Sequence, residues 1–368
     1  MAAAGAATGL VSCAAARDGA AGGGGRGPRR PLSRRLDLPE DADPRVLGVL
    51  DLDGATLGDG GLGDMPPDVT RRRPTDAGGL SALHVGDDLS VAFVGDTGTW
   101  ATARLALDAR GVPLALRDAR RGFLRGPGGR VLAERRQEGD AEALARLPDG
   151  SWLVAFERWH RLQHHRALDA PGRVVPLPAA LDEGPRNGGI EAMAVLADGR
   201  VLVLAERGAP GAPDRTVRRA WVADGPGRPW RPFAYRPEPG GFEPTGASGL
   251  PDGGALVVER RVSLLAGGVE GRLARIAPEA LAREGIEGRL VEAETVLRLA
   301  PPLPTDNWEG VSAFRHGGRR LAALVSDDNA SALQRTLLMV VDLGPAGSHD
   351  GEGGDGGPVM AAPAPARR

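Results

Sequence analysis

Residues 189–207, GIEAMAVLADGRVLVLAER, restrict the possible folds more than any other stretch, because related stretches recur along the chain. Two strand-like segments flank Asp198-Gly199, a dipeptide that favours the two-residue type I′ turn of a β-hairpin. Counting outward from that turn places Glu191 directly opposite Glu206. The unit is therefore predicted to be a hairpin with two glutamates facing each other at its open end.

The related stretches recur at similar spacing. They are residues 78–96, 140–158, 189–207, 244–261 and 307–329. Their leading positions are separated by 64, 49, 54 and 64 residues and are Gly78, Glu142, Glu191, Thr245 and Glu309. This period fits one four-stranded blade of a β-propeller with outer loops of variable length.

Both faces of the hairpin at residues 189–207 are apolar. The two expected faces are Met193, Val195, Leu202 and Leu204 on one side and Ala192, Ala194, Val201 and Val203 on the other. A sheet that is apolar on both sides must be covered twice, as in blades packed around an axis. Residues 337–343, LLMVVDL, are expected to pair with the strand near residue 46 and to close the ring. We therefore predict an all-β fold, a single β-propeller at residues 41–344.

The two ends of the chain differ from this repeat region in composition. Residues 1–40 are interpreted as a signal or lipoprotein-like segment with a flexible tether, and residues 345–368 as a disordered tail. Leu10-Val11-Ser12-Cys13 resembles a bacterial lipobox, whose cysteine is lipidated after cleavage. This predicts an extracytoplasmic protein, periplasmic or attached to a membrane through Cys13. The alternative is a cytoplasmic protein with a disordered Ala/Gly tail, since no Lys or Arg precedes the apolar part.

Composition and motifs exclude several classes of function. All 46 basic residues are arginine, so Schiff-base chemistry and a P-loop lysine are excluded. The formal net charge is -2 and no long basic run occurs, so no nucleic-acid partner is expected. No G-x-S-x-G motif is present, and Ser248 and Ser312 have no partner in the sequence, which disfavours a serine hydrolase.

Facing carboxylates are expected in more than one hairpin. Glu142 should lie opposite Glu157, and the last copy brings Glu309, Asp327 and Asp328 to the same end of its sheet. Because the first residue of one strand and the last residue of its partner share one end, these acids should gather at one rim of the central channel. Two like charges across a strand pair repel by a few tenths of a kcal/mol or more, so a counter-charge or a shared proton must compensate.

Hard oxygen ligands that converge on one axis suit calcium better than zinc. The candidate metal ligands are Glu142, Glu157, Glu191, Glu206 and Asp327. The same counting places Thr245 opposite Arg260 and Glu309 opposite Ser326, so the acid ring is incomplete in the fourth copy. A structural ring of glutamate–arginine ion pairs between blades and a set of proton-sharing carboxylates remain alternatives to Ca²⁺.

Five motifs in order carry a family resemblance. They are GGLSAL from residue 78, DAEALARLPDGSWLVAFERWHR from 140, NGGIEAMAVLADGRVLVLAER from 187, LPDGGALVVERR from 250, and DNWEGVSAF with SDDNASALQRTLL within 306–338. Together they resemble the bacterial esterase-like or phytase-like β-propeller proteins over residues 45–343. The resemblance implies a six-bladed propeller, often exported, with phosphate-ester or carboxylic-ester hydrolase activity. A degenerate sixth blade is then expected within residues 97–139 or shared between the termini.

Two hypotheses for the function follow. The first is a metal-assisted hydrolase, in which Ca²⁺ polarises a phosphoryl or acyl oxygen of a small anionic or ester substrate. Its candidate catalytic residues are Glu309, Asp328 and Glu191, and its candidate substrate-binding residues are Arg158, Arg207 and Arg335. The second is a non-catalytic ligand- or partner-binding propeller whose acidic ring is structural. A monomer is expected in both cases.

Overall fold

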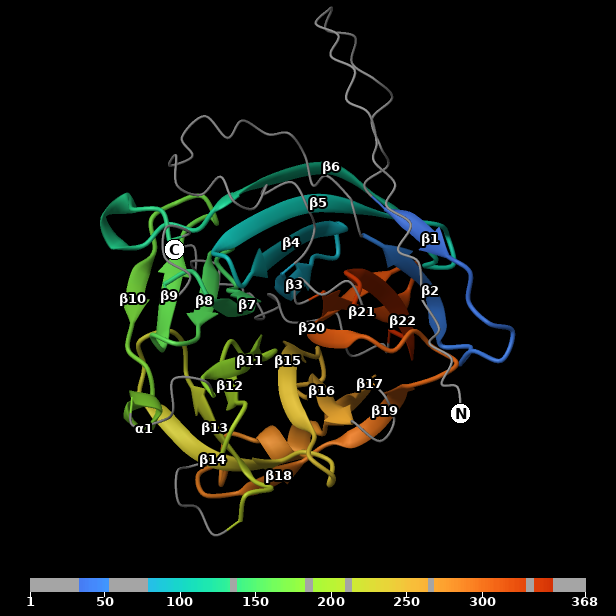
Figure 1. Cartoon of the computed structure of the whole chain (residues 1–368). Helices are drawn as coiled ribbons and strands as arrows, with labels where there is room; N and C mark the ends of the chain where they lie inside the picture. Colours follow the sequence, from blue (N-terminus) through green and yellow to red (C-terminus); the bar gives the residue numbers. More distant parts are fainter. Residues whose placement is uncertain are drawn as a thin grey trace, which may run out of the picture. The chain divides into compact units, whose positions relative to one another are not determined.

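Five β-sheets account for the strands of the computed structural model, which describes residues 33–52, 79–132, 138–182, 188–208, 214–263, 268–328 and 334–346. The fold concerns the unit that begins at Pro31. Seen along the axis of this unit, the sheets are arranged around a centre like blades (Figure 1).

Each sheet begins with an inner strand beside this centre and continues outward. The first sheet contains β3 (Leu80–Val85), β4 (Ser90–Gly95), β5 (Thr99–Leu107) and β6 (Pro113–Phe123). The second contains β7 (Ala141–Arg146), β8 (Trp152–Phe156), β9 (Arg161–His165) and β10 (Arg173–Val175). The third contains β11 (Ile190–Val195), β12 (Val201–Ala205), β13 (Arg218–Ala223), β14 (Trp230–Arg236) and β18 (Leu290–Glu292). The fourth contains β15 (Glu243–Gly249), β16 (Ala255–Ser263), β17 (Gly268–Ile276) and β19 (Glu294–Leu299). The fifth contains β20 (Asn307–His316), β21 (Arg319–Asp327), β22 (Leu337–Pro345), β2 (Val46–Asp51) and β1 (Arg34–Leu36).

Helices are short and lie between strands. Among the described residues they are α1 (Ala179–Asp182) and the 3₁₀ segments Pro127–Gly129 and Pro278–Leu281. Within the described ranges, no helix has the length and apolar character needed to cross a membrane.

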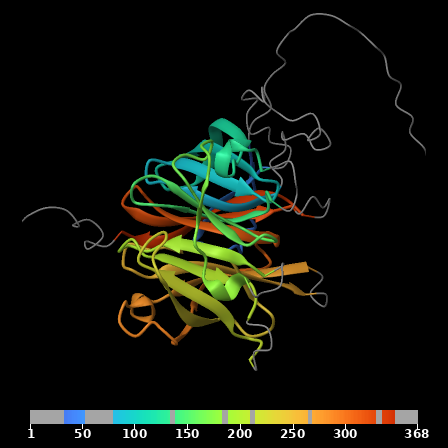
Figure 2. The ribbon, with the colours of Figure 1, turned by 90° about the vertical axis from the view of Figure 1, so that its left-hand side faces the viewer.

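The five inner strands form a closed ring in chain order. β3 contacts β7, β7 contacts β11, β11 contacts β15, β15 contacts β20, and β20 contacts β3. In the side view, the orange-to-red strands β20–β22 lie between the cyan and teal β3–β6 sheet and the yellow and orange sheets (Figure 2). The prediction of a single all-β propeller is confirmed.

The ring closes through pairing of the two ends of the repeat region. β2 pairs antiparallel with β22, as predicted for residues 337–343 and the strand near residue 46. β1 then pairs with β2, so residues 34–36, which were expected to belong to a tether, form the outer edge of this blade.

The prediction of a sixth blade is wrong, because the described residues form five sheets. Residues 97–139, where a degenerate blade was expected, contain β5 and β6, the two outer strands of the first sheet. The strands from the two ends of the repeat region complete the fifth sheet and do not form an additional one. Each sequence copy therefore corresponds to one blade.

The hairpin turns differ from the expected type I′. Between β11 and β12, the Leu196 N–H donates to the Arg200 carbonyl and the Gly199 N–H donates to the Leu196 carbonyl. Of the turn residues, Gly199 has positive φ (80°) and Asp198 does not, which is the three-residue loop with a type I turn and a left-handed final residue. The loop of β20–β21 is the exception, because Gly317 and Gly318 both have positive φ between the paired residues His316 and Arg319.

A β-bulge shifts the register further at the open end of each hairpin. Glu206 donates its backbone N–H to the Gly189 carbonyl, so it does not lie opposite Glu191 as expected. Likewise the backbone N–H of Glu157 donates to the Asp140 carbonyl, so Glu157 does not lie opposite Glu142. Arg260 pairs with Glu243 instead of Thr245, and Ser326 pairs with Trp308 instead of Glu309. The last hairpin is displaced by one position only, because its turn has the expected two residues.

The apolar faces pack between neighbouring blades, as the two-sided pattern predicted. The register shift exchanges members between the faces: Ala192, Ala194, Leu202 and Leu204 pack in one core cluster, and Met193, Val195, Val201 and Val203 in the next. Each sheet is thus covered on both sides, and the loops at the ends of the inner strands are left to build a site.

Candidate active site

A β-bulge occurs at the same place in all five inner strands, near the strand's first residue. The extra residue in each case is one of Ser81, Glu142, Glu191, Thr245 and Glu309. A bulge leaves one residue outside the ladder and turns its side chain, which is why bulges often lie beside active sites. One bulge residue comes from each blade, near the start of its inner strand.

Two overlapping groups of carboxylates lie at this end. Asp140, Glu142 and Glu157 form one group and Glu157, Glu191 and Glu206 the other, with ligand oxygens in each group within 4.8 Å of one another. Glu157 belongs to both groups and therefore links the β7–β8 hairpin to the β11–β12 hairpin. The structure thus brings together four of the five predicted metal ligands, Glu142, Glu157, Glu191 and Glu206.

Burial and mutual repulsion raise the pKa values of these acids. Burial, followed by repulsion from Glu142, Glu206 and Glu309, raises the pKa of Glu191 well above its usual range. Burial, and then Asp140 and Glu309, do the same for the pKa of Glu142. Glu309 from the fifth blade repels both residues, so the bulge carboxylates converge on one region.

Arginines neutralise only part of this charge. Arg158 pairs with Asp140, Arg207 with Glu206 at 3.2 Å, Arg260 with Glu309 at 3.2 Å, and Arg218 with Glu243 at 3.8 Å. Burial opposes the charge on Arg260, but Glu309, Glu191 and Glu206 outweigh it and raise the pKa of that guanidinium. In the described part of the chain, no ion pair reaches Glu142, Glu157 or Glu191 at contact distance. The predicted ring of ion pairs therefore accounts for one side of the site and leaves the other acidic.

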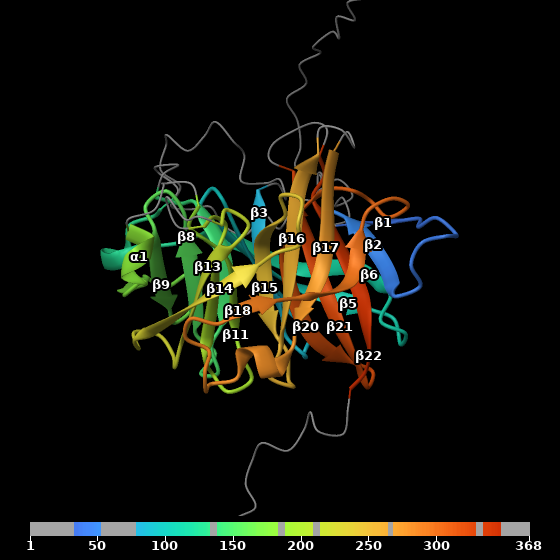
Figure 3. The same cartoon turned by 90° about the horizontal axis from the view of Figure 1, so that it is seen from below.

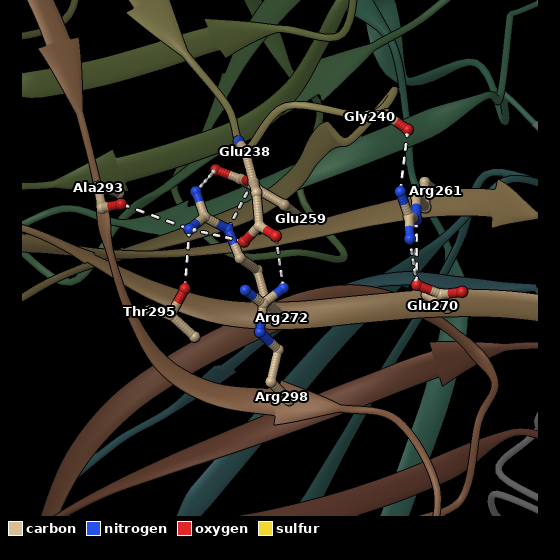
Figure 4. Close-up of polar contacts among 9 residues, drawn as sticks. All are labelled: Glu238, Gly240, Glu259, Arg261, Glu270, Arg272, Ala293, Thr295 and Arg298. Carbon is tan, nitrogen blue, oxygen red and sulfur yellow. Dashed lines mark hydrogen bonds and ion pairs between the residues drawn. The ribbon is translucent and has the colours of Figure 1, made fainter.

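A buried carboxylate elsewhere in the protein shows the contrast. Glu259 on β16 is fully buried and accepts hydrogen bonds from Arg272 Nε and Nη2 at 2.8 and 2.9 Å and from the Glu238 N–H at 3.0 Å (Figure 4). It also accepts one from the Tyr235 hydroxyl. Glu191 is also buried, with 7% of its surface exposed. Glu157 receives a hydrogen bond from the Gly188 N–H at 2.7 Å, whereas the described residues give the Glu191 carboxylate none.

The remaining predicted site residues lie on or beside the strands of the fifth blade. Glu309 accepts a hydrogen bond from Asn307 Nδ2 at 2.6 Å and faces Arg260. Arg335 lies 3.5 Å from Asp306. Asp327 and Asp328 stand at the end of β21 and belong to neither carboxylate group. Cys13 lies outside the described residues.

Four residues of the site were not among the candidates predicted from the sequence. Asp140 stands just before β7 and Glu243 is the first residue of β15, and Asn307 and Arg218 bind acids of the site. The one signal for Asp140 was its position two residues before Glu142. Ser248 and Ser312 accept backbone N–H groups of Ala313 and Val85 on the neighbouring inner strands, so both hydroxyls tie blades together.

The match to known families spans this whole arrangement. Residues 75–330 match the family described as phytase-like, esterase-like activity of phytase. The chain belongs to this family. The matched range of this phytase-like protein contains all five inner strands with their bulges and both carboxylate groups.

Comparison with solved structures finds similar chains at low sequence identity. The comparison with curated proteins finds no match. Among solved structures, a luciferin-regenerating enzyme is 11% identical with a TM-score of 0.40, covering 74% of this chain and 94% of that chain. The β-propeller domain of Cps50 (Swd1) from Myceliophteria thermophila is 12% identical with a TM-score of 0.34, covering 72% of this chain and 96% of that chain.

Proposed function

We propose that this phytase-like propeller is a calcium-dependent hydrolase of small phosphate esters, with carboxylic esters as the second substrate class. One observation carries the proposal: the buried Glu191 carboxylate has no hydrogen bond or ion pair with any described residue and lies within 4.8 Å of two further carboxylates. A buried charge without partners is strongly unfavourable, so the arrangement favours a bound cation or a proton.

The donor set fits calcium. The oxygens of Asp140, Glu142, Glu157, Glu191 and Glu206 are all carboxylate oxygens, with no sulfur or imidazole among them. Such hard ligands are typical of Ca²⁺ sites, whereas zinc sites usually include cysteine or histidine. When bound, the ion would supply Lewis-acid polarisation of a phosphoryl or acyl oxygen.

Arginines around the acids would bind the anionic part of the substrate. The side chains of Arg158 and Arg207 are 48% and 54% exposed while paired with Asp140 and Glu206, so part of each guanidinium faces solvent beside the carboxylate groups. Guanidinium groups bind phosphate oxygens in a bidentate manner. Glu309 is the candidate base for an attacking water. Burial raises its pKa, while Arg260 and Asn307 oppose that shift and hold the carboxylate in place.

The proposal extends to the setting of the protein. We expect a monomer in an extracytoplasmic compartment, where free calcium is sufficient for a site with weak to moderate affinity. Attachment through a lipidated Cys13 is part of this proposal, with a cytoplasmic location as its alternative.

Hydrolysis assays test the proposal directly. Purified protein is assayed on p-nitrophenyl phosphate, phytate and p-nitrophenyl acetate, with calcium and with chelator. We expect calcium-dependent turnover that is lost in Glu191→Gln and kept in Glu292→Gln, whose 62% exposed side chain lies outside the site. Calcium binding without turnover of any substrate would contradict the hydrolase and favour a non-catalytic ligand-binding propeller.

A further inference from the structure

A cavity lies at the mouth of the ring opposite the bulge residues. It has a volume of about 230 Å³ and is bordered by the last residues of two inner strands, Val195 of β11 and Gly249 of β15, and by Phe314 near the end of β20. In the view across the axis, the strands of these blades run from one mouth to the other (Figure 3). At about 3.3 Å per residue, Val195 lies roughly 13 Å along β11 from Glu191, so the cavity is distinct from the acidic site.

The inner strands are packed tightly between the two mouths. A Cβ atom on Gly249 would lie 2.0 Å from the Val195 carbonyl oxygen, and one on Gly246 would lie 2.4 Å from the Glu309 carbonyl oxygen. Only glycine permits this close approach of β15 to both neighbours. The Thr245 hydroxyl also donates to the Trp308 carbonyl at 2.9 Å. A ligand at the far mouth would therefore be bound by that mouth's own residues.

The cavity combines apolar walls with two arginine side chains. Its walls include Val195, Leu196, Leu250, Pro251, Ala313 and Phe314. Arg315 and Arg320 also line it, against one lining carboxylate, Asp87, which accepts the backbone N–H of Arg315 at 2.7 Å.

Arg320 is the under-compensated cation of the pair. Its nearest acid, Asp252, lies 3.7 Å away and is already bound by Arg275 at 2.7 Å. Arg320 Nε is buried and has no hydrogen-bond partner within the described part of the chain. A buried donor of this kind is normally satisfied, so an acceptor from a ligand would fit here.

We propose that this cavity is a second binding site, for a small carboxylate that carries an apolar body. The carboxylate would be bound by Arg320 and Arg315, and the apolar body would pack against Phe314, Leu250 and Val195. The site is independent of the proposed hydrolysis, because it shares no side chain with the carboxylate groups.

Calorimetric titration with three probes tests the site. Benzoate has both features, acetate lacks the apolar body, and benzyl alcohol lacks the charge. We expect saturable binding of benzoate at one site, weaker by about tenfold for each of the other probes. Arg320→Gln and Arg315→Gln should each weaken benzoate binding by about tenfold, as expected for loss of a charge-assisted hydrogen bond.

Two control variants make the result specific. Arg34→Gln removes an arginine that is 75% exposed on the edge strand, and Glu191→Gln alters the other mouth, so both should bind benzoate like the unmodified chain. Absence of saturable benzoate binding would overturn the proposal. Equal affinity for benzyl alcohol, or unchanged affinity in both folded arginine variants, would also overturn it. Loss of binding in Glu191→Gln with retained binding in Arg320→Gln would place the benzoate site at the acidic mouth instead.

Discussion

The carboxylates of Glu157 and Glu191 have oxygens within 4.8 Å of each other, although β8 and β11 belong to different sheets. Glu157 also reaches Asp140 and Glu142 on its own side of the boundary between the two blades. The strongest acidic crowding in the described residues thus coincides with a junction between blades. A cation bound there would join the two blades as well as serve catalysis.

Replacing Glu191 should change stability in opposite directions with and without calcium. In chelator, Glu191→Gln removes a buried, repelled charge, so the melting temperature should rise above that of the unmodified chain. In excess calcium the variant lacks one metal ligand and binds the ion more weakly. Its melting temperature should therefore be lower than that of the unmodified chain. Thermal denaturation in both buffers measures this. A variant that melts lower in both buffers would show that Glu191 is structural.

The metal-free protein should become less stable as the pH rises above the unfolded-state pKa of glutamate. Burial and repulsion raise the pKa values of Glu142 and Glu191 in the folded state, so the folded protein binds more protons than the unfolded chain between the two values. Stability then falls with pH from about 4.5 up to the raised folded-state pKa values and stays low above them. Urea denaturation in chelator across this range measures the slope, which should be smaller in Glu142→Gln and Glu191→Gln. An unchanged slope in both variants would assign the pH dependence to other groups.

Breaking the Arg260–Glu309 pair should be costly. Arg260 is 20% and Glu309 10% exposed at the side chain, so Arg260→Gln leaves a buried carboxylate without its cation and should destabilise the fold by about 3–5 kcal/mol. The double variant with Glu309→Gln should recover much of this loss. Arg236→Gln is the control, because its partners Glu292 and Asp214 are 62% and 47% exposed, and loss of such exposed pairs should change stability little. Additive effects in the double-mutant cycle would contradict the coupling.

The Glu259 network should be required for folding and should not affect calcium binding. Arg272 contacts both Glu259 and Glu238, the latter at 3.2 Å, and Arg272→Met should destabilise the protein by about 3–5 kcal/mol. Tyr235→Phe removes one hydrogen bond to the same carboxylate and should cost about 1–3 kcal/mol. Urea denaturation checks both values, and calcium titration of Tyr235→Phe should match the unmodified chain. A lowered calcium affinity in that variant would link the two regions.

The fold could be predicted from the sequence because the hairpin repeats and the closing strand are local patterns. The register could not. A Leu-x-Asp-Gly stretch is compatible with a two-residue turn and with the three-residue loop that Leu196 to Arg200 adopt. The hydrogen bond from the Leu196 N–H to the Arg200 carbonyl distinguishes the two. Leu89, with φ of 62°, takes the position that Gly199 fills in the third blade, so the residue type alone does not mark the loop.

The sequence predicted which residues belong to the site better than it predicted the contacts between them. Glu142, Glu191, Thr245 and Glu309 were recognised as leading positions, and each proves to be a bulge residue. The neighbour of Glu191 is Glu157 from another blade, a contact that depends on how sheets pack and that no hairpin count can give. The predicted number of six blades came from the family resemblance. The five hairpin copies in the sequence predict the observed number of sheets correctly.

Calcium titration of the full chain tests the central claim most directly, with Glu191→Gln and Glu292→Gln measured beside it. We predict saturable calcium binding by the unmodified chain and by Glu292→Gln, with affinity reduced about tenfold or more in Glu191→Gln. An unmodified chain that binds no calcium, or a folded Glu191→Gln variant that binds it equally well, would contradict a cation site between these blades.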